Sequence, residues 1–216
     1  MPKKYILFDH DGVLVDTEHW YYRANQRALA PLGIELPLDE YLVNMSQGIT
    51  TWASARAQGI PEADIDQARI LRNQYYQEYL ATEEIEISGV LETLAILAKD
   101  YQMAIITTSK PADFDLIHKE RSIIDPMAFC LTRNDYDNAK PHPEPYLKGL
   151  ERFGATAAET VVVEDSARGL QSAVAAGIDC IAVANAFTAS HDLSQATAKI
   201  ATIADLPAAI KKLDTP

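Results

Sequence analysis

The stretch Phe8-Asp9-His10-Asp11-Gly12-Val13-Leu14-Val15-Asp16-Thr17-Glu18 decides the fold class of this chain. It begins in the short apolar run 5–8, and a short apolar run bounded by a turn signal predicts a buried strand. Asp9 and Asp11 therefore lie where a core strand ends, although burying an unpaired carboxylate is costly. Gly12 lets the backbone turn sharply and approach a ligand closely. The stretch predicts a carboxylate site assisted by a metal ion rather than a packing element.

The composition limits the size of the fold and the class of partner. With 216 residues, of which 48% are hydrophobic, the chain can form one large domain or one domain with a smaller insert. The formal net charge of −12 argues against a nucleic-acid partner, because phosphate backbones attract basic surfaces. An anionic substrate stays open, since a metal ion or a lysine can reverse the field within one cleft.

The cysteines and the apolar runs indicate a compartment. Cys130 and Cys180 both lie in apolar stretches, and we interpret them as small core residues. No apolar run has the length of a signal peptide or a membrane helix. We therefore expect a cytoplasmic protein without disulfides and without a membrane partner.

Apolar runs with strand character alternate with helical patterns. The predicted strands are 5–8, 103–107, 128–131, 161–163 and 180–183. The predicted helices between them include 90–99, 143–153 and 167–176. Such alternation predicts an α/β fold, a doubly wound parallel sheet with helices on both faces.

One interval interrupts this alternation. Between residues 17 and 88 the sequence has no convincing strand, and segments 18–32, 38–44, 50–58 and 62–82 all have helical patterns. We interpret residues 17–88 as an inserted all-helical cap domain, with 1–16 and 89–216 forming the α/β core domain. The alternative is that these helices pack directly onto the core as part of one domain.

Three further polar segments follow predicted strands, where open α/β sheets bind their ligands. Thr107 and Thr108 offer hydroxyls and turn amides that suit a phosphate oxygen. Lys140 precedes a proline-rich loop that limits its motion. Glu164 and Asp165 end a fully apolar run. Each of the first two signals is weak alone, because threonine-rich turns and surface lysines are common.

The acids form the stronger signal. Glu164 and Asp165, taken with Asp9 and Asp11, make an oxygen-rich site suited to a hard cation. Magnesium fits best, because it accepts a few carboxylates together with phosphate and water. No spacing of cysteine and histidine residues suggests zinc.

In this order, the four segments resemble the haloacid dehalogenase superfamily, in its phosphatase and phosphomutase branch. The resemblance rests on Asp9-His10-Asp11-Gly12-Val13, Thr107, Lys140-Pro141 and Glu164-Asp165, and it spans most of the chain. The helical insert after the first strand matches the capped subgroup that includes β-phosphoglucomutase and many small phosphosugar phosphatases.

The resemblance implies a role for each matched residue. Asp9 would be the nucleophile that forms an aspartyl-phosphate, and Asp11 the general acid and base. Magnesium would be bound by Asp9, Asp165 and the backbone carbonyl of Asp11, with Glu164 supporting these ligands from just outside. The remaining matched positions would serve the phosphate: Thr107 and the backbone amide of Thr108 would hold its oxygens, and Lys140 would offset its charge and that of Asp9.

The second acid decides between branches of the superfamily. Its dehalogenases need only the nucleophile and lack an aspartate two residues later, so Asp11 favours phosphoryl transfer. His10 departs from the commoner apolar residue between the two aspartates. We expect its ring to point away from the site, as packing or surface.

Residues of the insert are candidates for substrate selection. Thr17, Glu18 and His19 lie at the first hinge, and Gln47, Gly48 and Thr50 occupy a loop that could reach the substrate. We interpret Arg56 and Arg72 as solvated, the tyrosines at 75, 76 and 79 as packing within the cap, and the histidines at 118, 142 and 191 as surface or loop residues.

Three functions remain open. The leading one is a magnesium-dependent phosphatase acting on a small phosphorylated metabolite, a sugar or polyol phosphate, as a monomer. The second is a phosphohexose mutase like β-phosphoglucomutase, although Tyr21 and Thr51 stand where that enzyme has a cap histidine and an arginine. The third is a non-catalytic binding protein on the same fold, which the intact set of site residues disfavours.

Overall fold

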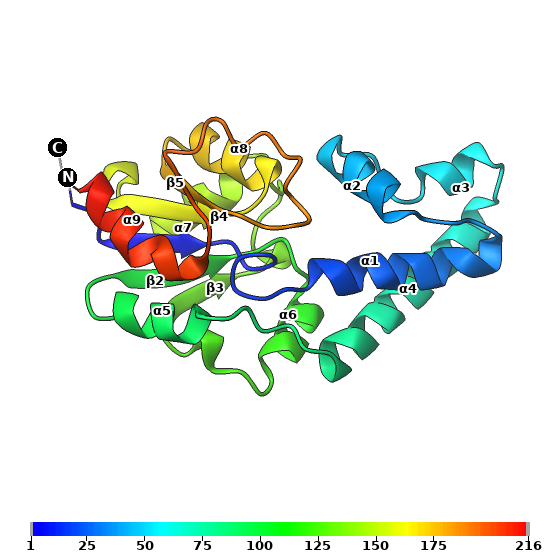
Figure 1. Ribbon diagram of the computed structural model, residues 1–216, viewed down its shortest axis with the longest axis horizontal. Helices are drawn as coiled ribbons and strands as arrows, with labels where there is room; N and C mark the ends of the chain where they lie inside the picture. Colours follow the sequence, from blue (N-terminus) through cyan, green and yellow to red (C-terminus); the bar gives the residue numbers. More distant parts are fainter. Residues whose placement is uncertain (1, 215–216) are drawn as a thin grey trace. The chain divides into compact units, whose positions relative to one another are not determined.

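The protein has an α/β fold built on a six-stranded parallel sheet, with a helical cap inserted after the first strand (Figure 1). The structure is a computed structural model and describes residues 2–214. The chain divides into two compact units, one formed by Met1–Asp16 with Glu86–Pro216 and the other by Thr17–Ile85. Glu86 belongs to the first unit because it pairs with Val15 in an isolated β-bridge.

The strand order of the sheet is β3-β2-β1-β4-β5-β6, and every neighbouring pair is parallel. The strands are β1 (Tyr5–Phe8), β2 (Gln102–Ile106), β3 (Met127–Leu131), β4 (Thr160–Glu164), β5 (Asp179–Val183) and β6 (Ala198–Ile200). The first five agree with the sequence prediction to within a residue at each end. The short edge strand β6 was not predicted.

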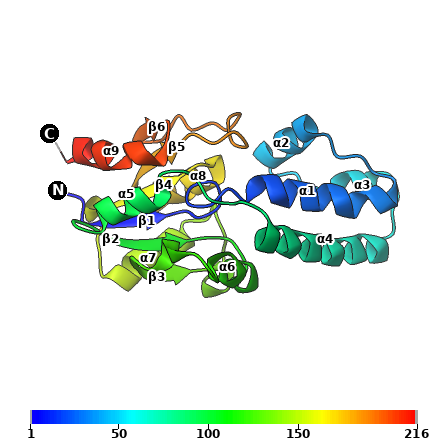
Figure 2. The ribbon, with the colours of Figure 1, turned by 60° about the horizontal axis from the view of Figure 1, so that its bottom comes forward.

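The helices of the core unit cover both faces of the sheet (Figures 1 and 2). They are α5 (Val90–Leu97), α6 (Pro111–His118), α7 (Glu144–Phe153), α8 (Ala167–Ala175) and α9 (Leu206–Leu213). Helices α7 and α8 bury Tyr146, Leu150 and Leu170 against Leu7 and Val162 of the central strands. Because β1 lies between β2 and β4, the carboxyl ends of these three strands meet at the middle of one sheet edge.

The cap unit is helical throughout its regular structure. Its helices are α1 (Glu18–Leu29), α2 (Leu38–Ser46), α3 (Ala53–Ala57) and α4 (Glu62–Thr82). Helices α1 and α4 lie side by side in both ribbon views, with Tyr21 of α1 meeting Tyr76 of α4 edge to face at 5.1 Å between ring centroids. Of the three tyrosines predicted to pack in the cap, Tyr76 is buried, whereas Tyr75 and Tyr79 are half-buried.

Two cap arginines behave differently from one another. Arg56 is exposed and pairs with Glu62, as predicted for a solvated residue. The prediction for Arg72 is wrong, because its side chain is half-buried and lies over the Tyr21 ring at 4.5 Å from the ring centroid. Its guanidinium donates hydrogen bonds to the Tyr21 hydroxyl and to Asn25 Oδ1. Helix α1 therefore desolvates a cation on α4.

The two cysteines differ in burial. Cys180 is buried in the core, whereas Cys130 is half-buried, and both are free thiols. Over the residues that the structure describes, no helix has the length and apolar character needed to cross a membrane.

Candidate active site

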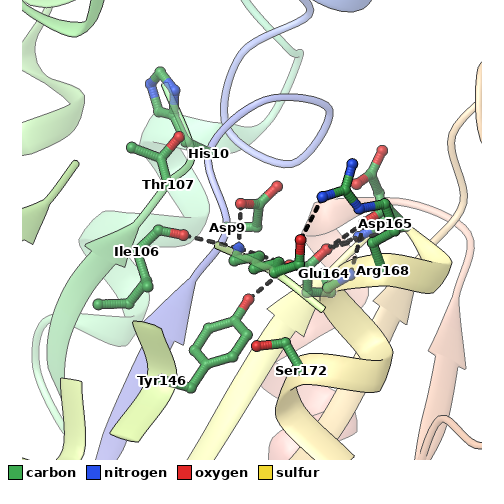
Figure 3. Close-up of polar contacts among 12 residues, drawn as sticks. Asp9, His10, Ile106, Thr107, Tyr146, Glu164, Asp165, Arg168 and Ser172 are labelled. Atoms are coloured by element: carbon green, nitrogen blue, oxygen red, sulfur yellow. Dashed lines mark hydrogen bonds and ion pairs between the residues drawn. The ribbon is translucent and has the colours of Figure 1, made fainter. Parts of the chain in front are cut away.

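Lys140 joins three of the strand ends. Its Nζ donates to Asp9 Oδ1 at 2.6 Å, to Glu164 Oε1 at 2.7 Å and to the carbonyl of Ile106 at 2.9 Å. These three bonds use all three protons of the ammonium group, so the side chain is fixed in place. Asp9 follows β1, Ile106 ends β2 and Glu164 ends β4 (Figure 3). Lys140 therefore links the ends of the three central strands.

Burial and neighbouring charges perturb the titration of these groups. Burial lowers the pKa of Lys140, but the carboxylates of Asp9 and Glu164 outweigh it, and the net pKa is raised. The pKa of Asp9 is also raised, by burial first and by the Glu164 carboxylate second, while Lys140 opposes both. A further cation beside Asp9 would favour its ionised form, because an opposite charge stabilises a carboxylate.

Glu164 is enclosed by hydrogen-bond donors. Oε1 accepts from Lys140 and from the Tyr146 hydroxyl at 2.6 Å, and Figure 3 shows that hydroxyl turned toward it. Oε2 accepts from the backbone amides of Asp165 and Ser166 and from the Ser166 hydroxyl. A Cβ on Gly169 would lie 1.7 Å from Oε1, so only glycine fits at this position in the first turn of α8, beside the Glu164 carboxylate. Glu164 thus holds other site residues in place.

Asp165 lies against the turn that follows β1. Its side chain is nearly fully buried, and a Cβ on Gly12 would come within 2.3 Å of Asp165 Oδ2. Gly12 has a φ of +82°, a conformation that side chains disfavour, and its carbonyl accepts a hydrogen bond from Asn185 Nδ2 at 3.2 Å. The glycine predicted to allow close approach therefore makes room for an acid of the site.

The acids form a donor set that fits a hard divalent cation. One carboxylate oxygen from each of Asp9, Glu164 and Asp165 lies within 4.8 Å of the other two. The Lys140 ammonium contacts two of these carboxylates, those of Asp9 and Glu164. Because Glu164 already accepts from five donors, Asp9 and Asp165 are the carboxylates better placed to bind a magnesium ion directly.

Asp11 is surrounded by groups that can both donate and accept hydrogen bonds. Its Oδ2 accepts from the Ser109 hydroxyl at 2.5 Å and from the Thr107 hydroxyl at 3.3 Å, and His10 Nδ1 lies 3.4 Å away. The Thr107 hydroxyl also accepts from the backbone amide of Ser109. Asp11 is therefore oriented by hydroxyls that tolerate either protonation state of the carboxyl group.

Comparison with known proteins agrees with this arrangement. The sequence profile of the haloacid dehalogenase-like hydrolases matches residues 6–183. The chain belongs to the haloacid dehalogenase-like hydrolase family. The phosphoglycolate phosphatase of Salmonella typhi is 29% identical over 195 residues, which cover 80% of this chain and 77% of that protein.

Solved structures share the whole architecture of this family member. A conserved haloacid dehalogenase-like protein of unknown function from Agrobacterium tumefaciens, ATU0790, superposes with a TM-score of 0.80 at 28% identity, over 99% of this chain and all of that one. CbbY from Rhodobacter sphaeroides, solved in complex with phosphate, has a TM-score of 0.78 at 22% identity, over 94% of this chain and 96% of that one. The predicted superfamily and its capped α/β fold are thus confirmed.

The structure of this family member brings together most of the predicted site residues. Asp9, Asp11, Thr107, Glu164 and Asp165 lie at the carboxyl ends of β1, β2 and β4 or in the loops that follow, and Lys140 reaches them from the segment between β3 and α7. Thr108 is exposed, and the role predicted for its backbone amide stays a prediction. Ser109, which was not predicted, contacts Asp11. In a turn, the side chain two positions after Thr107 can face the same residue as Thr107 does. The spacing of the Thr107 and Ser109 hydroxyls could therefore have identified Ser109.

Other supporting residues carry weaker sequence signals. Tyr146 looks like an ordinary apolar-face residue of α7, yet its hydroxyl binds Glu164. Tyr136 donates from its hydroxyl to the Thr107 carbonyl at 2.6 Å, which fixes the end of β2. Both contacts join segments far apart in the chain, so local patterns do not reveal them.

The two histidines differ from their predicted surroundings. The His10 ring is predicted to point away from the site, as packing or surface. The ring is turned away from Asp9 (Figure 3), but it is fully buried and its Nδ1 lies 3.4 Å from Asp11 Oδ2, so both the direction away from the site and the surface alternative are wrong. The assignment of His118 to the surface is also wrong, because the last residue of α6 is turned inward and only 8% exposed. His142 is exposed in a loop and His191 is half-buried in another.

Proposed function

We propose that this family member is a magnesium-dependent phosphatase that hydrolyses a small phosphorylated metabolite through an aspartyl-phosphate. The observation that carries the proposal is the pairing of two acids with different surroundings. Asp9 is held by a fixed ammonium group, whereas Asp11 is held by hydroxyls and a histidine that allow it to gain and lose a proton. Dehalogenation has no need of the second acid.

In the first step, a carboxylate oxygen of Asp9 attacks phosphorus and the bond from phosphorus to the ester oxygen breaks. Asp11 donates its proton to the departing oxygen, so that an alcohol leaves rather than an alkoxide. Lys140 remains bonded to Asp9 Oδ1 and lowers the repulsion between the anionic nucleophile and the anionic phosphoryl group. The hydroxyl of Thr107 and the backbone amide of Thr108 are the candidates for holding the phosphoryl oxygens.

In the second step, Asp11, now ionised, removes a proton from water, and the resulting nucleophile attacks phosphorus. The bond from phosphorus to Asp9 breaks, which releases phosphate and restores the Asp9 carboxylate. A magnesium ion held by Asp9, Asp165 and the Asp11 carbonyl would supply charge neutralisation at the phosphoryl oxygens. Glu164 holds the backbone of Asp165 in position for that role.

Hydrolysis of p-nitrophenyl phosphate tests the proposal. Activity should require magnesium and should fall by at least about four orders of magnitude in Asp9→Asn, because the amide is a poor nucleophile. Asp100→Asn, at an exposed position after α5, is the matched control and should retain wild-type activity. A wild-type protein inactive toward a broad set of phosphate esters, with magnesium present, would refute the proposal.

The substrate class follows from a screen of sugar, polyol and short-chain acid phosphates, with phosphate release measured against a magnesium-free control. The Salmonella typhi relative is a phosphoglycolate phosphatase, and a mutant of CbbY from Rhodobacter sphaeroides was solved in complex with xylulose-1,5-bisphosphate, which supports inclusion of short-chain acid and sugar phosphates. Interconversion of sugar 1- and 6-phosphates with little phosphate release would instead identify a mutase. We propose that the unit Thr17–Ile85 selects the substrate as a cap and that the protein acts as a monomer.

A further inference from the structure

Two buried imidazole rings lie behind Asp11. His10 Nε2 and His118 Nε2 are 2.9 Å apart, and His10 Nδ1 is 3.4 Å from Asp11 Oδ2. The Phe114 ring contacts both imidazoles, at 5.0 Å from His10 and 4.5 Å from His118 between centroids. The contact joins the turn after β1 to the last residue of α6, 108 residues away. Apolar side chains would fill this space without the cost of burying polar nitrogens.

The bond between the two Nε2 atoms requires one donor and one acceptor. Burial, followed by the neighbouring His10, lowers the pKa of His118 to about 3, so at neutral pH this ring carries a single N–H. Its other nitrogen, Nδ1, is buried and has no hydrogen-bond partner among the residues described. For a His10 ring that carries one proton, the position of the His118 proton therefore decides the tautomer.

The ionised form of Asp11 selects between the two arrangements. If His118 Nε2–H donates, His10 accepts at Nε2 and carries its proton on Nδ1, where it points at the Asp11 carboxylate. If His118 accepts instead, its Nδ1–H is a buried donor without a partner, and the His10 Nδ1 lone pair faces a carboxylate. The second arrangement combines an unsatisfied donor with a repulsive contact, and both are costly.

We propose that His10 and His118 are positioning residues for Asp11. His118 fixes His10 in the Nδ1–H tautomer, and His10 and Ser109 together restrain the Asp11 carboxylate. This inference rests on the proposed function, because it concerns the proton transfer assigned to Asp11. The 3.4 Å between His10 Nδ1 and Asp11 Oδ2 is longer than a strong hydrogen bond. His10 therefore orients the Asp11 carboxylate, and Ser109 makes the shorter hydrogen bond to it.

Leaving-group dependence tests the proposal, because the Asp11 proton matters most when the leaving oxygen is basic. Phenyl phosphate and p-nitrophenyl phosphate have similar size, but phenolate, whose conjugate acid has a pKa of about 10 as in tyrosine, is the more basic leaving group. In His10→Leu and His118→Phe, kcat/KM should fall roughly tenfold for phenyl phosphate, a fraction of the full value of general acid catalysis, and only slightly for p-nitrophenyl phosphate. Asp115→Asn, exposed on α6, is the control.

A rescue variant separates positioning from packing. His10→Asn retains a side-chain N–H donor near the position of Nδ1 and should recover most of the phenyl phosphate activity. Adding His118→Phe to His10→Asn should then cost nothing further, because an amide has no tautomer to fix. Equal losses for both substrates, or failure of His10→Asn to recover activity in a variant that stays folded by circular dichroism, would overturn the proposal.

A spectroscopic measurement is independent of catalysis. In wild-type protein labelled with ¹⁵N-histidine, long-range proton–nitrogen correlation should show His10 as the Nδ1–H tautomer at neutral pH, and this signature should be lost in His118→Phe. An Nε2–H tautomer for His10 would contradict the inference whether or not the protein hydrolyses phosphate esters. Conversely, a wild type inactive toward every ester with the expected tautomer would count against the proposed function alone.

Discussion

The ion pairs around Lys140 in the core unit are buried, whereas the two arginine–glutamate pairs of the cap unit compared with them are exposed. In the core unit, Lys140 is nearly fully buried and binds Asp9 and Glu164, which lie 131 and 24 residues away in the sequence. In the cap unit, the pairs Arg27–Glu78 and Arg56–Glu62 have side chains that are 40–57% exposed. Exposed pairs contribute little to stability, whereas removing one member of a buried cluster is strongly destabilising. The stability of the core unit should therefore depend on the charges of its site, and that of the cap unit should depend little on these exposed pairs.

Replacing Lys140 should give the largest effect. Lys140→Met leaves the Asp9 and Glu164 carboxylates buried beside each other, and the free energy of unfolding should fall by about 4 kcal/mol at neutral pH. Hydrolysis of p-nitrophenyl phosphate should also be lost, because the nucleophile is no longer held or neutralised. Urea denaturation measures the stability, with the cap variant Arg56→Met as the control, expected to change it by less than about 0.5 kcal/mol. Equal effects in the two variants would break the contrast between the units.

The neighbouring acids Glu164 and Asp165 sharpen the comparison within the core. Glu164→Gln removes one carboxylate from the Lys140 cluster and should lower the free energy of unfolding by about 3 kcal/mol. Asp165→Asn should instead raise the magnesium concentration for half-maximal activity by at least about tenfold, with a smaller loss of stability. Magnesium titrations and urea melts of both variants check this division. The reverse result, in which Asp165 dominates stability and Glu164 the magnesium requirement, would show that Glu164 is the direct ligand.

The site residues that could be predicted from the sequence are those next to strands or helices with clear patterns. Asp9, Asp165 and Lys140 follow strands or precede helices with clear patterns, so their shared place at one sheet edge follows from the alternation of elements. The resemblance to a known superfamily then supplied their roles. The edge strand β6 has only three residues and no apolar run, so its sequence carries no strand signal.

Contacts between distant segments set the limit of prediction. His118 looks like a surface residue at the end of α6, and only the tertiary fold brings it to His10. Arg72 looks like an exposed helical arginine, and its partners Tyr21 and Asn25 belong to another helix. His118 and Arg72 are thus each covered by residues distant in the sequence, and no local sequence pattern identifies those residues.

Lowering the pH from 7 to 5 should lower the free energy of unfolding, because His118 is protonated more readily in the unfolded state. Its folded-state pKa is about 3, below the ordinary value of 6.5, so the unfolded state binds more protons between these values and stability falls as pH falls below 6.5. By pH 5 this group alone should cost about 2 kcal/mol relative to neutral pH. His118→Phe should therefore lose less stability than the wild type between pH 7 and pH 5, as measured by urea denaturation. Identical pH dependence in the two proteins would show that His118 is protonated in the folded core.

Arg72 offers the smallest effect and the most direct challenge to the contrast, because it is the half-buried cation of the cap. The guanidinium donates to three neutral acceptors, the Tyr21 hydroxyl, Asn25 Oδ1 and Asn73 Oδ1, and it lies over the Tyr21 ring. No buried carboxylate is left behind, but the buried Asn25 Oδ1 loses its donor. Arg72→Met should therefore cost about 1.5 kcal/mol, which combines that loss with the lost cation–π contact, less the packing that methionine retains. Arg23→Met, exposed on α1, is the control and should be near neutral in the same urea melts. A loss above about 3 kcal/mol, the scale of a broken buried pair, would mean that the cap also depends on a buried charge.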